Sequence, residues 1–240
     1  MKNLLILCLL FFQVSCATKY VIPGNRFMTP ETQGTGFMAG QQIEVQQTDA
    51  VEGTLHFDEN SKMDGVSYTA DTKTGFLFSN SLFERLDLLW SHTGSGNSMF
   101  GAKVQILGDT KATRTEGHKL AISGTFGSNE HETDDAAVEF RLSGKEYMLM
   151  YGYRFNEYSM LYSSFSHASY DFSGIINSSY AGLNGTRPES NTLARGIYAG
   201  GELNFSSLFI KVECGYQQLI TTESPNFSHV VSGFAVGFGW

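Results

Sequence analysis

The chain has 240 residues, of which 26 are Gly, only 4 are Pro and 13% are aromatic. Charged residues make up 17% of the chain, which is below the roughly 25% of ordinary globular domains. The formal net charge is −8, and this acidic balance, without a basic patch, argues against a nucleic-acid-binding protein.

The first residues have the composition of an export signal. Lys2 provides a minimal positive region, and Leu4–Phe12 is a continuous apolar run followed by small residues. A run of this length is too short to span a bilayer as an anchor. We therefore predict a secretory signal peptide over residues 1–16.

Two processing sites remain open. Cleavage after Ala17 would leave Thr18 as the new N-terminus. Alternatively, Val14-Ser15-Cys16 resembles a lipoprotein box, in which Cys16 is acylated and becomes the first residue. Gln13 departs from that pattern, which usually has Leu there. The short positive region and the position of the cysteine directly after a small residue favour lipidation.

Residues 17–35 have no periodicity and hold Pro23, Gly24, Pro30 and Gly34. From residue 36 onward, short runs alternate large apolar side chains with small or polar ones, which is the pattern of β-strands. The predicted strands are Phe37–Val45, Tyr68–Phe78, Leu86–His92, Phe100–Leu107, Leu120–Phe126, Ala136–Phe155, Tyr158–Phe172, Leu193–Phe205, Leu208–Ile220 and His229–Trp240.

Short and long connections alternate between these strands. We predict turns at Ser79–Arg85, Asn156–Glu157 and Phe205–Leu208. Loops are expected at Asp49–Gly65 and Ser128–Asp135, although Val51–Phe57 could instead extend a strand. The total is about ten strands, with eight or twelve as alternatives because the first loop and one strand are ambiguous.

The ambiguous strand is Ala136–Phe155. Its face parity changes around Ser143–Gly144, which indicates either a β-bulge or a turn. We expect a bulge, because the aromatic and leucine positions from Tyr147 to Phe155 form one continuous outward stripe.

The last strand carries the clearest pattern. Phe234, Val236, Phe238 and Trp240 alternate with Gly or Ala, so one face suits hydrocarbon and the other leaves room in a narrow interior. A chain that ends on an aromatic residue of such a strand resembles the bacterial outer-membrane β-barrels. That resemblance implies an all-β, antiparallel up-and-down barrel over residues 36–240.

The resemblance also implies the cellular setting. The expected compartment is the outer membrane of a Gram-negative bacterium, and the expected partners are its lipid and the barrel-assembly machinery. In this family the assembly machinery reads the closing strand, so Phe238 and Trp240 are the expected signal. Residues 17–35 would then be a periplasmic linker or an N-terminal plug.

The predicted inward positions include charges of both signs, which we expect to pair and fill a narrow lumen. Two functions follow. One is a structural or interaction barrel, with extracellular loops and a periplasmic or surface protein as partner; the other is a porin-like channel for small solutes. The inward charged positions are Glu44, Asp71, Lys73, Asp87, Lys103, Glu139, Arg141, Arg154, His167, Glu202, Lys211 and Glu213.

A lipid-modifying enzyme is a third and weaker alternative. A nucleophile and its base must share one face, whereas adjacent strand residues point to opposite faces. We therefore expect no enzyme and no catalytic residues. No metal or cofactor is expected either, because the cysteines lack metal-ligand spacing. The candidate sets weighed were Ser166–His167 with Asp171, Ser228–His229 with Ser232, and His131 with Asp134 and Asp135.

Overall fold

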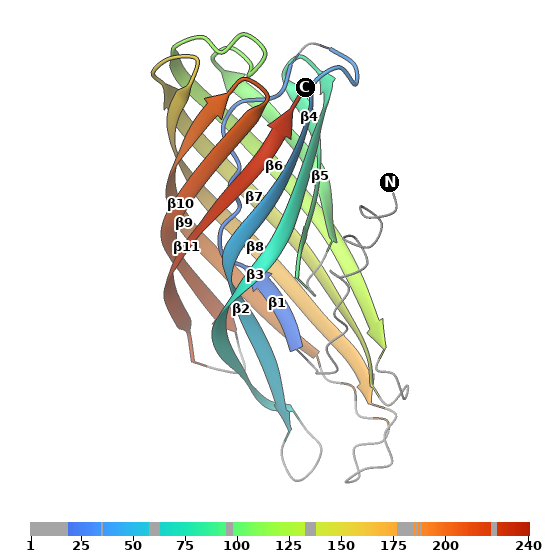
Figure 1. The fold of residues 1–240 in the computed structure, drawn as a ribbon. Helices are drawn as coiled ribbons and strands as arrows, with labels where there is room; N and C mark the ends of the chain where they lie inside the picture. The colour runs from blue at the N-terminus through green and yellow to red at the C-terminus, as the bar shows by residue number, and fades with distance from the viewer. Residues whose placement is uncertain are drawn as a thin grey trace, which may run out of the picture.

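The computed structural model describes residues 19–34, 36–57, 63–94, 98–132, 138–176, 185, 187, 189–221 and 225–240. They form one antiparallel sheet that closes on itself, because β2 pairs with β11 on one side and with β3 on the other. Ten strands, β2 to β11, make the wall of a barrel (Figure 1). The predicted all-β, ten-stranded barrel is thus confirmed.

Each wall strand pairs with its neighbour in the sequence, as in an up-and-down barrel. The extra strand β1 (Lys19–Pro23) pairs with β2 alone. The wall strands are β2 (Gln41–Phe57), β3 (Met63–Phe83), β4 (Leu86–Thr93), β5 (Ser98–Leu107), β6 (Gly117–Glu132), β7 (Val138–Arg154), β8 (Ser159–Ile176), β9 (Glu189–Phe205), β10 (Leu208–Thr221) and β11 (Phe227–Gly239).

The first two wall strands are longer than the sequence pattern predicted. The expected loop over Asp49–Gly65 is largely strand, since β2 continues to Phe57 and β3 begins at Met63. Likewise, the expected turn over Ser79–Arg85 is strand as far as Phe83. Polar residues of both segments belong to paired strands, and Ser79, Asn80 and Ser81 are buried inside the barrel, so polarity alone did not mark a loop.

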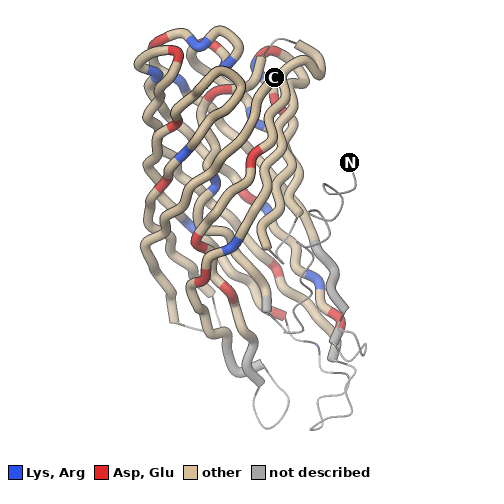
Figure 2. The backbone as a smooth tube through the Cα atoms, viewed as in Figure 1, with Lys and Arg blue, Asp and Glu red and all other residues tan. Residues whose placement is uncertain are grey.

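Both ends of the wall meet at one end of the barrel. The Gln41 amide donates to the Trp240 carbonyl at 2.9 Å, and the Trp240 amide donates back at 3.0 Å. The connections at this end include the short turns 84–85 and 206–207. In bacterial barrels the short turns are periplasmic, so we orient this end toward the periplasm. Figure 2 shows charged residues of both signs on several of the connections at this end.

The outer surface of the wall has two zones. In the belt zone, next to the periplasmic end, exposed side chains are large and apolar, as a lipid-facing surface requires. In the outer zone beyond it, exposed side chains such as Lys145, Arg195 and Asp171 are polar. The boundary of the belt zone with the outer zone is marked by the exposed apolar residues Val45, Trp90, Phe100, Phe126, Tyr147, Phe165, Ile197, Tyr216 and Val230.

Strand β7 crosses both zones without interruption. Its pairing with β6 and with β8 has no register shift, so the bulge predicted at Ser143–Gly144 is wrong. Glu139 and Arg141 face outward, contrary to the prediction, whereas Phe140 and Leu142 are buried inside. The interior is apolar at this level and the exterior is aqueous, so polarity reverses along the strand while the backbone alternation continues.

Candidate functional site

The barrel interior is occupied by the chain that precedes the wall. Strand β1 pairs with β2 from Ala50 to Thr54, and residues 24–34 then run along the lumen to the periplasmic end (Figure 1). We call residues 19–34 the lumen segment. From Tyr20 to Gly34 every residue is buried except Pro23, which is half-buried. The sequence did not predict β1, because its five residues lack a wall-strand pattern.

The first part of the lumen segment packs into an apolar cluster. Tyr20 and Ile22 are buried against inward residues of the outer zone, and the Tyr20 ring stacks on Phe172 with 5.9 Å between centroids. The Tyr20 hydroxyl lies 3.2 Å from Thr192 Oγ1, so its polar end is also satisfied. This packing explains why the wall turns apolar inside at the level of Leu142 and Phe172.

The middle of the lumen segment is held by two carboxylates. Arg26 Nε donates to Glu146 Oε1 at 2.8 Å and to Oε2 at 2.9 Å. The Arg26 amide donates to Glu213 Oε1 at 3.1 Å, and Asn25 Nδ2 reaches the same oxygen at 3.2 Å. Charge-assisted bonds of this kind are about twice as strong as neutral ones. Glu146 and Glu213 therefore fix both the backbone and the charge of Arg26.

Two wall lysines bind the carbonyl groups of the lumen segment. Lys211 Nζ donates to the Phe27 carbonyl at 2.8 Å and to Glu44 Oε2 at 2.5 Å. Lys103 Nζ donates to the Glu31 carbonyl at 2.5 Å and lies 3.5 Å from Asp87 Oδ2. These contacts satisfy backbone groups that have no partner within a strand.

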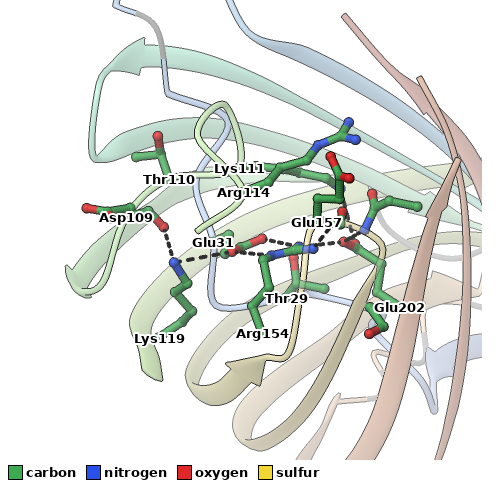
Figure 3. Close-up of polar contacts among 12 residues, drawn as sticks. Thr29, Glu31, Asp109, Thr110, Lys111, Arg114, Lys119, Arg154, Glu157 and Glu202 are labelled. Carbon is green, nitrogen blue, oxygen red and sulfur yellow. Dashed lines mark hydrogen bonds and ion pairs between the residues drawn. The ribbon is translucent and has the colours of Figure 1, made fainter. Parts of the chain in front are cut away.

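An ion-pair network surrounds Glu31 at the periplasmic end (Figure 3). Arg154 donates from Nε to Glu31 Oε1 at 2.8 Å and from Nη2 to Oε2 at 2.5 Å. Lys119 Nζ lies 3.7 Å from the same carboxylate. Glu202 joins the network because its Oε1 lies 3.2 Å from Arg154 Nη2 and its Oε2 lies 3.1 Å from Lys111 Nζ. One carboxylate from the lumen segment thus pairs with two wall cations.

The buried charges balance. Among the described residues, six cations and six carboxylates are buried, and Arg26 and Glu31 of the lumen segment supply one of each. Removing one partner of a buried ion pair costs about 3–5 kcal/mol, because the other charge remains without compensation. The lumen segment and the wall are therefore energetically dependent on each other.

The periplasmic mouth is closed by the connection between β5 and β6. The Lys111 amide donates to the Thr32 carbonyl at 2.8 Å, and the Gln33 amide donates to both oxygens of Asp87 at 3.1 Å. Gly34 has a φ of 78°, and a Cβ there would collide with the Thr110 side chain. The lumen segment therefore leaves the lumen at the one residue type that this close approach permits.

The lumen segment borders a small cavity. One cavity of about 20 Å³ lies beside Arg26, Met28, Glu146 and Tyr170. A volume of this size holds about one water molecule.

The structure places most of the predicted lumen residues inside the barrel. Each of them contacts the lumen segment or a wall residue that does so. The buried inward residues are Glu44, Asp87, Lys103, Arg154, Glu202, Lys211 and Glu213.

The inward assignment of His167 is wrong. Ser166 is buried, and its hydroxyl lies 3.3 Å from the Tyr198 hydroxyl, whereas His167 is half-buried on the outer face. The predicted parity of β8 placed Tyr162 outward, but its ring lies inside the barrel over Gly200, where a Cβ would strike it. Gly200 on the neighbouring strand therefore leaves room for the inward ring of Tyr162.

Asp71 was also predicted inward, but its side chain is 51% exposed. It pairs with Lys73 at 2.6 Å, and Lys73 also contacts Glu52. At the C-terminus, Phe238 and Trp240 face outward and are exposed. Cys16 lies outside the described residues.

The enzyme candidates do not converge. Ser166 and His167 lie on opposite faces of β8, as do His229 and Ser232 on β11. Ser232 Oγ instead donates to Asp49 Oδ2 at 3.0 Å. Asp134 and Asp135, the proposed partners of His131, lie outside the described residues. In the part of the chain that the structure describes, no group of His, Cys, Asp and Glu side chains could hold a metal ion.

Comparisons with known proteins show similarity of fold only. No protein-family model matches the chain, and no curated protein matches it. Among solved structures, the chain is similar to Ail, the attachment invasion locus protein of Yersinia pestis, in complex with the heparin analogue sucrose octasulfate. The identity is 14%, the TM-score is 0.40, and the match covers 84% of this chain and 97% of Ail.

Two further solved barrels are similar. The outer membrane protease OmpT of Escherichia coli is 8% identical with a TM-score of 0.45, covering 88% of this chain and 99% of OmpT. Neisserial surface protein A is 10% identical with a TM-score of 0.26, and the match covers 83% of this chain and 94% of that protein.

The chain's own surface agrees with the barrel assignment. A closed antiparallel wall with an apolar belt outside and paired polar groups inside is the architecture of a transmembrane β-barrel. These features of the chain itself agree with the outer-membrane β-barrel expected from the sequence. No helix among the described residues has the length and hydropathy that crossing a membrane would need.

Proposed function

We propose that this protein is a closed structural or interaction barrel, in which the lumen segment acts as a resident plug. The observation that carries the proposal is the pairing of Arg26 with Glu146 and of Glu31 with Arg154, both fully inside the wall. Opening a path for solutes would require separating these pairs or moving them together. Each separation leaves buried charges without partners, which costs several kcal/mol.

The proposed working surface lies outside the lumen. The strands of the outer zone extend beyond the lipid belt and carry extracellular connections on a rigid cylinder, which suits contact with a surface partner. Catalysis is not part of the proposal, because Ser166 and His167 face opposite sides of the wall. Phe238 and Trp240, exposed at the end of the closing strand, are the proposed signal for the assembly machinery.

Single-channel conductance in a planar bilayer tests the proposal. The purified full-length protein is compared with a variant that lacks residues 18–34, and folding of both is checked by heat-modifiable gel mobility. We expect no stepwise conductance from the full-length barrel and clear steps from the folded deletion variant. Stepwise conductance from the full-length barrel would overturn the proposal and favour a channel for small solutes.

A matched variant separates plug removal from general disruption. Lys145→Met removes an exposed charge from the outside of β7 and leaves the lumen unchanged. We expect it to remain silent in the bilayer. Conductance from this variant would mean that any damage to the wall opens the barrel, and the plug would lose its specific role.

A further inference from the structure

The direction of the lumen segment can be read along one wall strand. Ile22 belongs to the apolar cluster that includes Leu142, near the outer end of β7. Arg26 pairs with Glu146, four positions further along β7, and Glu31 pairs with Arg154, its last residue. As the chain proceeds from 22 to 31, it therefore descends from the outer zone to the periplasmic end.

The beginning of the lumen segment lies beyond the lipid belt. Among the residues of β2 whose burial is described, up to Thr54, the last exposed apolar one is Val45, and the outward positions Gln47 and Asp49 are polar. Strand β1 pairs only with residues further out, from Pro23 opposite Ala50 to Lys19 opposite Thr54. Because β1 is antiparallel to β2, its N-terminal end points away from the periplasm.

The edge of β2 is shared between the closing strand β11 and the lumen segment. Strand β11 pairs with β2 only as far as Gly233 opposite Thr48. From Asp49 outward, β2 and β11 are no longer paired. The Asp49 carbonyl accepts a hydrogen bond from the Gly24 amide at 2.8 Å, and Asp49 Oδ2 accepts one from the Ser232 amide at 2.8 Å. Strand β1 then occupies the edge of β2 that β11 has left. One aspartate thus holds both the closing strand and the incoming chain.

From these contacts we propose that the chain enters the barrel from the extracellular side. The end of the chain before Lys19 is then displayed on the cell surface, although the wall itself begins and ends in the periplasm. A lipid on Cys16 would be attached three residues before Lys19, within about 11 Å of extended chain. Such a lipid would therefore be attached on the extracellular side of the barrel rather than on the periplasmic side.

This arrangement has a consequence for assembly. The lumen segment is covalently continuous with β2 and is enclosed by the complete wall. Its N-terminal end must therefore pass outward along the lumen, either as β2 pairs with β11 or after the wall has closed. The inference rests on the direction of the lumen segment, so it stands whether or not the closed barrel conducts.

An epitope inserted between residues 18 and 19 tests the proposal in whole cells. Antibody binding is measured on intact cells and again after the outer membrane is permeabilised. The same epitope between Ser95 and Gly96 serves as the extracellular control, and between Asn156 and Glu157 as the periplasmic control. We expect the first insertion to react fully on intact cells, with no gain on permeabilisation, as the extracellular control does.

A gain in signal only after permeabilisation, matching the periplasmic control, would overturn the proposal. If the epitope prevents folding, a short Gly-Ser insertion with one cysteine is placed at the same three positions in a Cys214→Ser background. Labelling by a membrane-impermeant maleimide on intact cells supports the same conclusion. Labelling at the first position only after permeabilisation contradicts it.

Discussion

The belt zone and the outer zone are built from the same strands but have opposite polarity. On β7 the belt zone places Leu149 outside and Arg154 inside, whereas the outer zone places Arg141 outside and Leu142 inside. The backbone alternation is unbroken between them. The reversal follows from the surroundings, because lipid covers the belt outside while water covers the outer zone and an apolar part of the lumen segment fills its interior.

The largest expected effect comes from breaking the charge network inside the belt zone. Arg154→Met removes the main partner of Glu31 and a partner of Glu202 while keeping the volume. We expect the free energy of unfolding to fall by about 3–5 kcal/mol, measured by urea titration in lipid vesicles. Lys145→Met on the outside of the same strand is the control, with an expected change within about 0.5 kcal/mol. Equal losses in both variants would contradict the network's role.

The apolar interior of the outer zone provides the next test. Leu142→Ala leaves a cavity beside Phe172 and Ile22, and it should cost about 2–5 kcal/mol. Ser143→Ala, one residue further along and outward, should change stability by no more than about 0.5 kcal/mol. The same urea titration measures both. A neutral Leu142→Ala would mean that the interior of the outer zone is not a packed core.

The boundary between the two zones on the outside of the barrel can be tested by placing an arginine on each side of it along β7. Leu149→Arg places a cation on the lipid face of the belt zone, with an expected cost of about 2–4 kcal/mol near the membrane centre. Ser143→Arg puts the same charge on the outer zone, where Arg141 and Lys145 already face water, and should cost little. Similar costs at both sites would remove the distinction between the zones.

The smallest expected effect concerns the junction between the zones at Asp49. Asp49→Ala removes the acceptor of the Ser232 amide and hydroxyl. Because these bonds are solvent-exposed, we expect a loss of about 1 kcal/mol, with faster hydrogen exchange at the outer end of β11. Unchanged exchange there would show that Asp49 does not hold the closing strand.

The belt zone could be predicted from sequence and the outer zone could not. Large outward side chains such as Ile210 and Val212 fixed the parity of β10, and the inward Lys211 and Glu213 followed from it. Beyond the belt the same rule placed Glu139 and Arg141 inside, because it assumed lipid on the outer face. His167 was misplaced for a different reason, since the large side chains of Tyr162 and Tyr170 on β8 face inward.

The sequence offered a plug over residues 17–35 as an alternative to a periplasmic linker, but it could not give the path or partners of the lumen segment, because the contacting residues are distant in the chain. Glu31 and Arg154 are 123 positions apart, and Arg26 and Glu146 are 120 apart. A segment that follows the lumen of a barrel takes its conformation from the wall, so it needs no periodicity of its own. Pro23, Gly24 and Pro30, which marked the segment as irregular, are compatible with a buried, extended path.

Backbone hydrogen exchange of the intact protein in lipid bilayers tests the central claim most directly. If the lumen segment is packed against the wall, the amides of Arg26 and Thr32, which donate to wall carboxylate and amide oxygens, exchange as slowly as those of β7 and β8. Slow exchange across residues 25–33 is the result we predict. Exchange there as fast as in an exposed turn would show that the segment does not occupy the lumen.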